Sequence, residues 1–232
     1  MTAWQQNLRR RFDRAAAGYD ALAQLQQQSA QRLLMALQPV LASSPKPLNI
    51  LDVGSGTGWL IKQLQAAQPS AWCCALDLSE GMLRSLSAGA NERVQRVCAD
   101  ASVLPMASSA FDLVVSNFAL HWCDDPLQVL NELHRVCVPG GQAFCVIPVS
   151  GSLSARGDTR TTGASLLPLA TWQHALAASP WTLRQADSET YEEFHDSPTA
   201  WLSTLRALGV TAQRPAASVN ALSPRQALQQ LH

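Results

Sequence analysis

Three glycines and one acidic residue mark a ligand-binding loop. The segment Leu51-Asp52-Val53-Gly54-Ser55-Gly56-Thr57-Gly58 places glycines at alternate positions directly after an apolar run. Glycine tolerates positive φ angles and leaves room for a ligand close to the backbone. A helix that starts after such a loop presents unpaired amides, which attract anionic groups. The pattern predicts a ligand cradle at the carboxyl end of a strand, where open α/β sheets bind their ligands.

Polar residues also follow three later apolar runs. They are Asp77 after 72–76, Asp100 after 93–98 and Asn117 after 111–116. The carboxyl ends of parallel strands meet at one edge of a sheet, so we expect these side chains to gather around one ligand. An acid about 20 residues beyond the glycines suits the hydroxyl groups of a ribose. Packing by itself requires none of these polar groups.

Apolar periodicity over the middle of the chain predicts strands that alternate with helices. The strands are 49–53, 72–76, 93–98, 111–116 and 142–148, and the helices are 57–67, 79–88 capped by Ser79, and 125–137 capped by Asp125. This order predicts an α/β fold with a mostly parallel sheet, right-handed crossovers and helices on both faces. Pro139-Gly140-Gly141 is expected to separate the last of these helices from the fifth strand.

The flanking segments complete a single predicted domain, 1–232. Residues 1–47 are expected to form a helical lid, ended by Pro39, and a linker; 48–150 form the ligand-binding core, and 151–232 the substrate side. In that last part we predict helices at 168–178, 200–208 and from Ser223, with a strand at 190–194. No run after Val210 has strand character, so the sheet is expected to lack its last strand. Either the sequence is a fragment, the reading we favour, or the two strands beside the gap close together, or a partner fills the gap.

Composition narrows the class of protein. Lysine plus arginine equal aspartate plus glutamate at 17 each, and 47% of the residues are hydrophobic, which indicates a globular chain. No apolar run has the length of a membrane span, and the N-terminus lacks a signal-peptide core. We expect a cytoplasmic protein that binds neither membrane nor nucleic acid. The six cysteines lack metal-ligand spacing and are expected to be core residues, so no metal site is predicted.

The loop G-x-G-x-G, preceded by Asp52, resembles motif I of the class I S-adenosylmethionine-dependent methyltransferases, which have a Rossmann-like fold. The resemblance implies S-adenosyl-L-methionine as methyl donor and Asp100 as the acid that contacts adenine. The donor-binding residues it implies are Asp52, Gly54, Ser55, Gly56, Asp77, Leu78, Met82, Asp100, Ala101 and Asn117. As apolar residues at helical spacing, Leu78 and Met82 equally suit the core.

Two further segments resemble a narrower family, the malonyl-acyl-carrier-protein O-methyltransferases of the biotin pathway. They are Phe12-x-Arg14-Ala15-Ala16-Ala17-x-Tyr19-Asp20 and Ser116-Asn117-x-Ala119-x-His121-Trp122-Cys123, where the family has glutamine in place of His121. The resemblance implies methylation of the free carboxylate of a malonyl thioester, carried by acyl carrier protein or coenzyme A. A carboxylate is already ionised near neutral pH, so no general base is needed. Tyr19 would face the substrate, and His121 would be either a pocket wall or, for a hydroxyl or amine acceptor, a base.

One family feature is missing. The family carries an H-x-N-R-F word whose arginine binds the substrate carboxylate, and Gly163-Ala164-Ser165-Leu166 stands there instead. Arg156 or Arg160 is the candidate replacement, since a guanidinium suits a carboxylate, and the alternative is that both are solvated loop arginines. A class I methyltransferase with another small acceptor and a methyl-donor-binding protein without catalysis therefore stay open. Acyl carrier proteins are acidic, so a protein that binds them should have a basic face. Five arginines form the candidate face: Arg9, Arg10, Arg11, Arg14 and Arg32. The protein is predicted to be a monomer.

Overall fold

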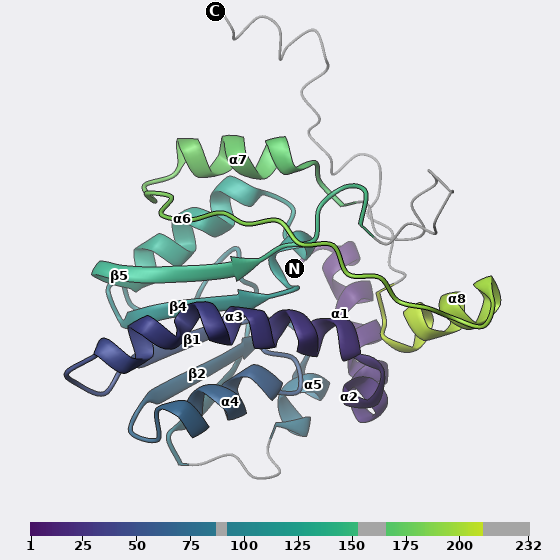
Figure 1. Ribbon diagram of the computed structural model, residues 1–232, viewed down its shortest axis with the longest axis horizontal. Helices are drawn as coiled ribbons and strands as arrows, with labels where there is room; N and C mark the ends of the chain where they lie inside the picture. The colour runs from purple at the N-terminus through teal and green to yellow at the C-terminus, as the bar shows by residue number, and fades with distance from the viewer. Residues whose placement is uncertain (87–91, 153–165, 211–232) are drawn as a thin grey trace, which may run out of the picture.

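Five parallel strands form the central sheet of the computed structural model, which describes residues 1–86, 92–152 and 166–210. The strands are β1 (Asn49–Val53), β2 (Trp72–Asp77), β3 (Val94–Cys98), β4 (Phe111–Asn117) and β5 (Cys137–Val146). Their order across the sheet is β3-β2-β1-β4-β5, and every neighbouring pair is parallel (Figure 1). The predicted parallel α/β fold is therefore confirmed, and β1 lies at its centre.

Helices connect the strands. They are α4 (Trp59–Ala67), α5 (Glu80–Ser85) and α6 (Pro126–Val136). The Ser79 hydroxyl accepts a hydrogen bond from the Met82 amide, and the Asp125 carboxylate accepts from the first amides of α6, so both predicted caps are confirmed. The helix after Ser79 was expected to reach residue 88, but α5 ends at Ser85, close to where the described segment stops.

Helices cover both faces of the sheet because neighbouring residues of each strand point to opposite faces. Ile50 packs into a cluster with α3 (Gln24–Ser43), α4 and α5, whereas Leu51 packs into a second cluster with α6 and α7 (Leu169–Ala178). Both side chains are fully buried. The sheet is thus held rigid between two apolar layers, which fixes the loops at its carboxyl edge.

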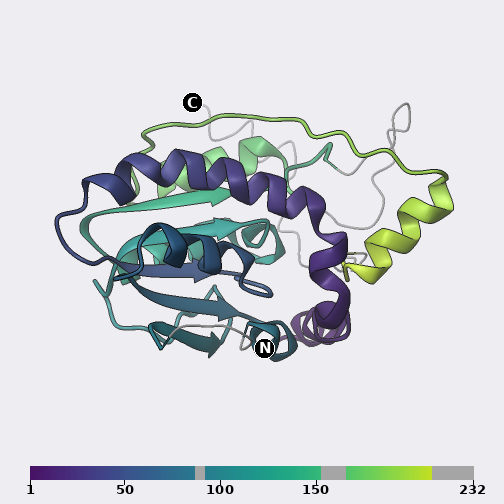
Figure 2. The same ribbon diagram turned by 60° about the horizontal axis from the view of Figure 1, so that its bottom comes forward.

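The N-terminal helices lie beyond the carboxyl ends of the strands (Figures 1 and 2). They are α1 (Ala3–Ala15), a 3-10 turn (Ala16–Gly18) and α2 (Tyr19–Leu22), followed by the long α3. Pro39 does not end this last helix, which continues to Ser43, so that prediction was wrong. Leu37 and Leu41 remain buried on either side of Pro39, and this packing outweighs the backbone bond that proline removes.

Two predictions for the later strands need correction. Residues 190–194 form no strand: the segment between α7 and α8 (Pro198–Ala207) runs irregularly over α3, where the Glu189 carboxylate contacts the Arg32 guanidinium at 3.1 Å (Figure 2). Phe194 is 88% exposed, so the β-favouring residues of this segment have no apolar surface to pack against. Moreover, Pro139-Gly140-Gly141 lies inside β5, in a bulge between the pairs Phe111–Cys137 and Leu113–Gln142.

The remaining expectations concern the ends of the sheet and the C-terminal helices. Helices α7 and α8 confirm the helices predicted at 168–178 and 200–208, while the helix predicted from Ser223 lies outside the described residues. In the described part of the chain, β5 is an outer strand and no strand follows it. No described helix is both long and apolar enough to cross a membrane.

Candidate functional site

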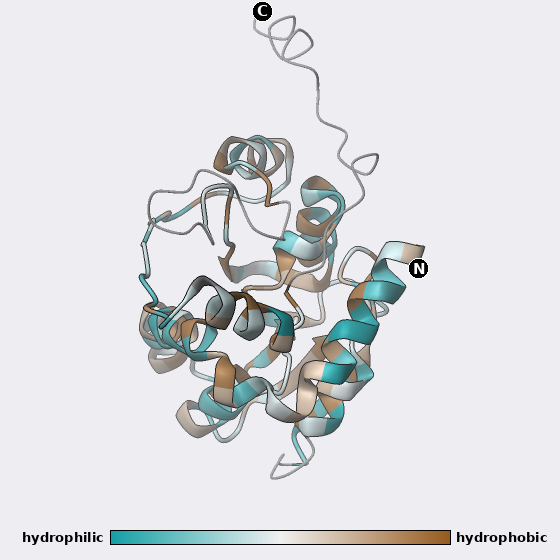
Figure 3. Ribbon diagram, turned by 90° about the vertical axis from the view of Figure 1, so that its right-hand side faces the viewer, coloured by the Kyte–Doolittle hydropathy of each residue, from teal (hydrophilic) through white to brown (hydrophobic). Residues whose placement is uncertain are grey.

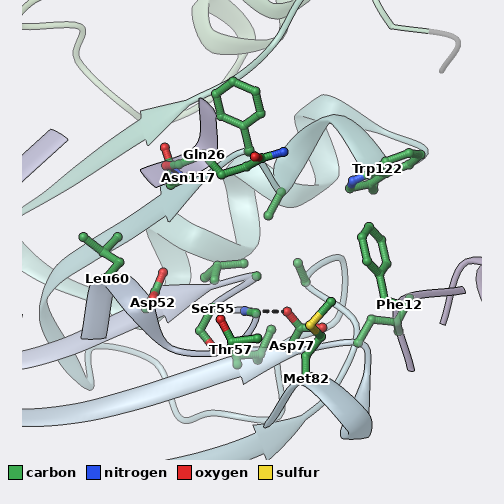
Figure 4. Close-up of a pocket in the computed structure, with 18 of the residues that line it drawn as sticks. Phe12, Gln26, Asp52, Ser55, Thr57, Leu60, Asp77, Met82, Asn117 and Trp122 are labelled. Atoms are coloured by element: carbon green, nitrogen blue, oxygen red, sulfur yellow. Dashed lines mark hydrogen bonds between the residues drawn. The ribbon is translucent and has the colours of Figure 1, made fainter. Parts of the chain in front are cut away.

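A pocket lies at the carboxyl edge of the sheet, between the strand-end loops and the N-terminal helices (Figure 4). All ten predicted donor-binding residues line it: Asp52, Gly54, Ser55, Gly56, Asp77, Leu78, Met82, Asp100, Ala101 and Asn117. Tyr19 lines it as well. Residues up to 65 positions apart in the sequence thus form one wall, as expected for the ends of parallel strands.

The glycine loop is shaped by close contact on one side and by open space on the other. Gly54 has a φ angle of +75°, and a Cβ atom there would lie 2.0 Å from the Cβ of Ala119. Gly56 also has a positive φ angle, +56°, but no atom lies within 4 Å of its Cβ position. Gly54 therefore permits loop packing against the end of β4, whereas Gly56 leaves pocket space free for a ligand.

Asp77 fastens the glycine loop to the end of β2. The Gly56 amide donates to Asp77 Oδ2 at 2.9 Å, and the Ser79 amide donates to Asp77 Oδ1 at 2.8 Å. Burial raises the pKa of this carboxyl to about 6, although the backbone hydrogen bonds lower it in part. Because each carboxylate oxygen has more than one lone pair, Asp77 keeps acceptor capacity toward the pocket.

Asp52 is buried without a hydrogen-bond partner for Oδ2, and its side chain is 1% exposed. Burial, with the nearby charge of Asp77, raises the pKa of Asp52 to about 8. A buried carboxyl in this state is stabilised by a cation or a hydrogen-bond donor. The pocket is lined by four carboxyl groups, of Asp20, Asp52, Asp77 and Asp100, and no lysine, arginine or histidine is among its described lining residues. Its electrostatics therefore favour a cationic ligand.

Lid residues bind the loops that follow β2 and β3. Gln5 Nε2 donates to Asp100 Oδ2 at 2.6 Å. Asp13 Oδ1 accepts from the Ser79 hydroxyl at 2.6 Å and from the Gly81 amide at 2.9 Å. These bonds place the inner side of α1 over the pocket.

Equivalent bonds hold α2 and α3 to the other two loops. The Thr57 hydroxyl, in the glycine loop, donates to Asp20, and the Ser29 hydroxyl donates to Asn117 Oδ1 at 2.6 Å. Asn117 Nδ2 in turn donates to the Gln26 carbonyl at 2.9 Å. Each of the first four strands thus ends in a loop that is hydrogen-bonded to the lid.

Tyr19 lines the pocket from the start of α2. Burial, together with the carboxylates of Asp77 and Asp20, raises the pKa of its phenol well above the ordinary value. The hydroxyl therefore stays protonated and can donate a hydrogen bond. Phe12 and Trp122 add apolar surface, with their rings packed edge to face at 5.8 Å (Figure 4).

The other predicted catalytic residues are placed differently. His121 is only 7% exposed and is not among the pocket-lining residues; its ring lies 4.6 Å from that of Trp122, which does line the pocket. His121 therefore lies behind Trp122, outside the pocket lining. Arg156 and Arg160 lie outside the described residues.

Sequence reasoning missed several pocket residues that the lid contributes, among them Gln5, Leu8, Asp20 and Gln26. The spacing of Gln5, Leu8 and Phe12 at i, i+3 and i+7 was the available signal, since it places the three on one helix face. That helix face carries polar as well as apolar residues, so hydrophobic periodicity did not indicate that it covers a pocket.

Comparison with known proteins assigns the family. A model described as a methyltransferase domain matches residues 51–145. The malonyl-[acyl-carrier protein] O-methyltransferase of Methylococcus capsulatus is 34% identical over 216 residues, which cover 88% of this chain and 77% of that protein. The malonyl-[acyl-carrier protein] O-methyltransferase of Hahella chejuensis is 35% identical over 220 residues, which cover 88% of this chain and 75% of that protein. This chain belongs to the malonyl-[acyl-carrier protein] O-methyltransferase family.

Solved structures confirm the fold of this family member. The putative methyltransferase from Haloferax volcanii, in complex with the Trm112 activator, superposes with a TM-score of 0.62 at 18% identity, covering 86% of this chain and 93% of that one. An S-adenosylmethionine-dependent methyltransferase from Mesorhizobium loti gives a TM-score of 0.55 at 22% identity, covering 66% and 82%. The methyltransferase therefore has the Rossmann-like class I fold. The family match extends beyond the core, since the relatives align over most of the chain.

Proposed function

We propose that this methyltransferase transfers a methyl group from S-adenosylmethionine to the free carboxylate of a malonyl thioester on acyl carrier protein. This reaction belongs to an early stage of biotin synthesis. The observation that carries the proposal is the identity of 34% to a malonyl-[acyl-carrier protein] O-methyltransferase over 88% of the chain. The site supports it, because Tyr19 of the lid and the glycine loop line the same pocket.

The pocket fits S-adenosylmethionine on its own chemistry. The unpaired Oδ2 of Asp52 and the absence of cationic side chains in the described lining suit a positively charged donor. We assign Asp77 to the ribose hydroxyls, Asp100 to the adenine amine, and Leu78 and Met82 to the adenine faces. When bound, S-adenosylmethionine supplies an activated methyl group on a sulfonium centre.

The protein contributes alignment and exclusion of water. A malonyl carboxylate is ionised at neutral pH, because an ordinary carboxyl titrates near 4, and it needs no general base. The protonated Tyr19 hydroxyl would donate to this carboxylate and orient it. The lid, held by its hydrogen bonds to four loops, closes the site, so the reaction is promoted mainly by proximity and orientation.

A cation for the acceptor carboxylate is assigned to the substrate-side part of the chain, 151–232. Arg156 and Arg160 are the proposed groups. In the same division of the chain, residues 1–47 form the lid and residues 48–150 form the donor-binding core. Replacing each arginine by alanine is expected to raise the KM for malonyl acyl carrier protein in one of the two variants, with donor binding unchanged. Full activity in both variants would place carboxylate recognition elsewhere.

One observation favours a second candidate, a class I methyltransferase acting on another small acceptor. The described pocket lining contains no cationic side chain that would form an ion pair with a carboxylate. The family's H-x-N-R-F word is also missing from the sequence. Under a third possibility the chain binds the donor without turnover on any acceptor.

A mass-shift assay separates these possibilities. The purified protein is incubated with S-adenosylmethionine and malonyl acyl carrier protein, and the carrier is weighed by intact mass spectrometry. Addition of one methyl group, absent with acetyl acyl carrier protein, supports the proposal. Rescue of a biotin-requiring strain that lacks its own malonyl methyltransferase tests the pathway assignment. Donor binding without any methylated carrier or rescue would refute it. We further expect a cytoplasmic monomer, which size-exclusion chromatography with light scattering tests for the oligomeric state.

A further inference from the structure

A groove lined by arginines lies between α1 and α8, on the side of α1 that faces away from the pocket. Its lining residues are Asn7, Arg10, Arg11, Arg14, Ala15, Arg206 and Ala207. The four from Asn7 to Arg14 follow the spacing i, i+3, i+4, i+7, which places them along one face of the helix. Figure 3 shows the hydrophilic colouring along α1, and Figure 1 shows α8 beside the lid.

Three arginines of this groove are exposed and unpaired by acids. Arg10, Arg14 and Arg206 form no ion pair with a carboxylate of the described residues. Arg11 instead donates from Nε to the Asn7 side chain at 2.9 Å. Helix α8 contains no acidic residue. The groove therefore carries a concentrated positive charge on a chain whose formal net charge is zero.

Two arginines of the predicted basic face are engaged elsewhere. Arg9 lies 3.6 Å from the Glu80 carboxylate and 3.8 Å from that of Asp13. Arg32 lies 3.1 Å from the Glu189 carboxylate. Asp13, the only acid of α1, accepts hydrogen bonds from the Ser79 hydroxyl and the Gly81 amide at the start of α5. The structure thus separates Arg9 and Arg32, which contact carboxylates, from Arg10 and Arg14, which line one groove together with Arg206.

The groove and the donor pocket share α1 as a common wall. Phe12 lines the pocket, and the Cβ position of Gly209, just after α8, lies 3.3 Å from the Arg11 carbonyl and 3.4 Å from the Phe12 ring. A helix with its side chains is about 10 Å thick. A macromolecule bound in the groove would therefore lie about one helix diameter from the pocket, within reach of a substrate held on a flexible arm.

We propose that this groove docks the acidic surface of the acyl carrier protein whose malonyl group enters the pocket. The inference rests on the proposed function and names its docking surface. The arginines of α1 span five residues, Arg10 to Arg14, about 6 Å at 1.5 Å per residue, and the positive charge continues with Arg206 on α8. Such a row matches several carboxylates on a protein surface better than a single phosphate group.

Charge reversal tests the groove. The variants Arg10→Glu, Arg14→Glu and Arg206→Glu are assayed with malonyl acyl carrier protein and with malonyl-pantetheine, which has neither carrier nor phosphate. Each is expected to raise the KM for the carrier substrate about tenfold and to weaken its salt dependence, with kcat little changed. Kinetics with malonyl-pantetheine should stay at the wild-type level, which also shows that each variant is folded.

Lys62→Glu is the matched control. It makes the same charge change at an exposed residue of α4, a helix that lies away from α8 in Figures 1 and 2. An equal rise in KM in this control would show that the effect comes from the net charge of the protein, and it would overturn the proposal. Unchanged KM for the carrier in all three groove variants would overturn it as well.

Direct binding keeps this inference distinct from the proposed function. Anisotropy of labelled apo acyl carrier protein, which lacks the phosphopantetheine phosphate, measures docking without any methyl transfer. Binding that the three groove variants lose and Lys62→Glu retains supports docking, even if no malonyl thioester is methylated. Binding only of the phosphopantetheine-bearing form would assign the groove to the phosphate and contradict docking of the acidic surface.

Discussion

The Gln5 side-chain amide donates to the Asp100 carboxylate at 2.6 Å, although the two residues are 95 positions apart. This bond joins α1 to the loop after β3, at the end of the pocket assigned to adenine. Since both residues line the pocket, the position of the lid and the shape of the donor site are coupled there.

Gln5→Ala should loosen the lid at this point. We expect donor affinity to fall several-fold, because a hydrogen bond of this kind contributes about 0.5–1.5 kcal/mol. Stopped-flow measurement of S-adenosylhomocysteine release should show a faster rate. The control is Gln6→Ala, an exposed neighbour on the same helix that makes no side-chain hydrogen bond in the described residues. Equal release rates in the two variants would show that the bond does not hold the lid.

Asp77→Ala should weaken donor binding more strongly. The change removes the proposed ribose contact and also leaves the Gly56 and Ser79 amides without their acceptor. Leaving buried partners unpaired costs about 1–3 kcal/mol, which corresponds to roughly tenfold or more in affinity. Calorimetric titration with S-adenosylhomocysteine measures the effect. An unchanged affinity would remove Asp77 from the donor site.

Asp52→Asn should weaken donor binding and raise the free energy of unfolding. Folding raises the pKa of Asp52 from its ordinary value of 3.8 to about 8, so the folded protein binds more protons than the unfolded chain between these values. The free energy of unfolding contributed by this group is therefore full below about pH 4 and falls as the pH rises toward 8. The variant lacks this loss, so its advantage over wild type should grow from pH 4 to pH 8.

Denaturant titrations of both proteins across this pH range provide the measurement. The exposed Asp196 supplies the control, because Asp196→Asn should show no comparable pH-dependent gain. Donor affinity of Asp52→Asn should also fall above about pH 8, where the wild-type carboxylate is ionised and the amide is not. A variant that gains no stability at pH 8 would contradict the buried, unpaired state of Asp52.

Tyr19→Phe should impair methyl transfer while the donor still binds. The phenol hydroxyl is proposed to orient the acceptor carboxylate, and its loss should lower kcat/KM for malonyl acyl carrier protein about tenfold, as for one hydrogen bond to a charged group. The only other tyrosine, Tyr191, provides the control, because its hydroxyl donates to Glu189 on the surface. A fully active Tyr19→Phe enzyme would show that the hydroxyl has no role in orienting the acceptor.

The two glycines of the loop should respond differently to alanine. Gly54→Ala adds a contact of 2.0 Å with Ala119 to the strain of a positive φ angle, so both thermal stability and donor binding should fall. Gly56→Ala brings only the strain, about 1–2 kcal/mol, and should keep its fold while its methyl group enters the donor space. Gly140→Ala, at φ +79° with no atom within 4 Å, is the control for strain alone. Normal donor binding by Gly56→Ala would exclude Gly56 from the donor site.

The sequence by itself determined the sheet and one wall of the pocket. Strands and crossover helices were predictable because buried apolar runs, caps such as Ser79 and Asp125, and the glycine loop are local signals. The residues from Asp52 to Asn117 were predictable as a site because parallel topology brings strand ends to one edge. Where local signals misled, as at Pro39 and at residues 190–194, burial or its absence prevailed.

Only the tertiary structure decided how the lid closes the site and where its charges lie. The pairing of Gln5 with Asp100 joins residues far apart in the sequence, and no local pattern specifies such a contact. The same holds for the arginines of α1, which are alike in the sequence. Packing directs Arg9 toward Glu80 and leaves Arg10 and Arg14 beside Arg206, because the helix face that packs on the pocket determines which side chains remain exposed.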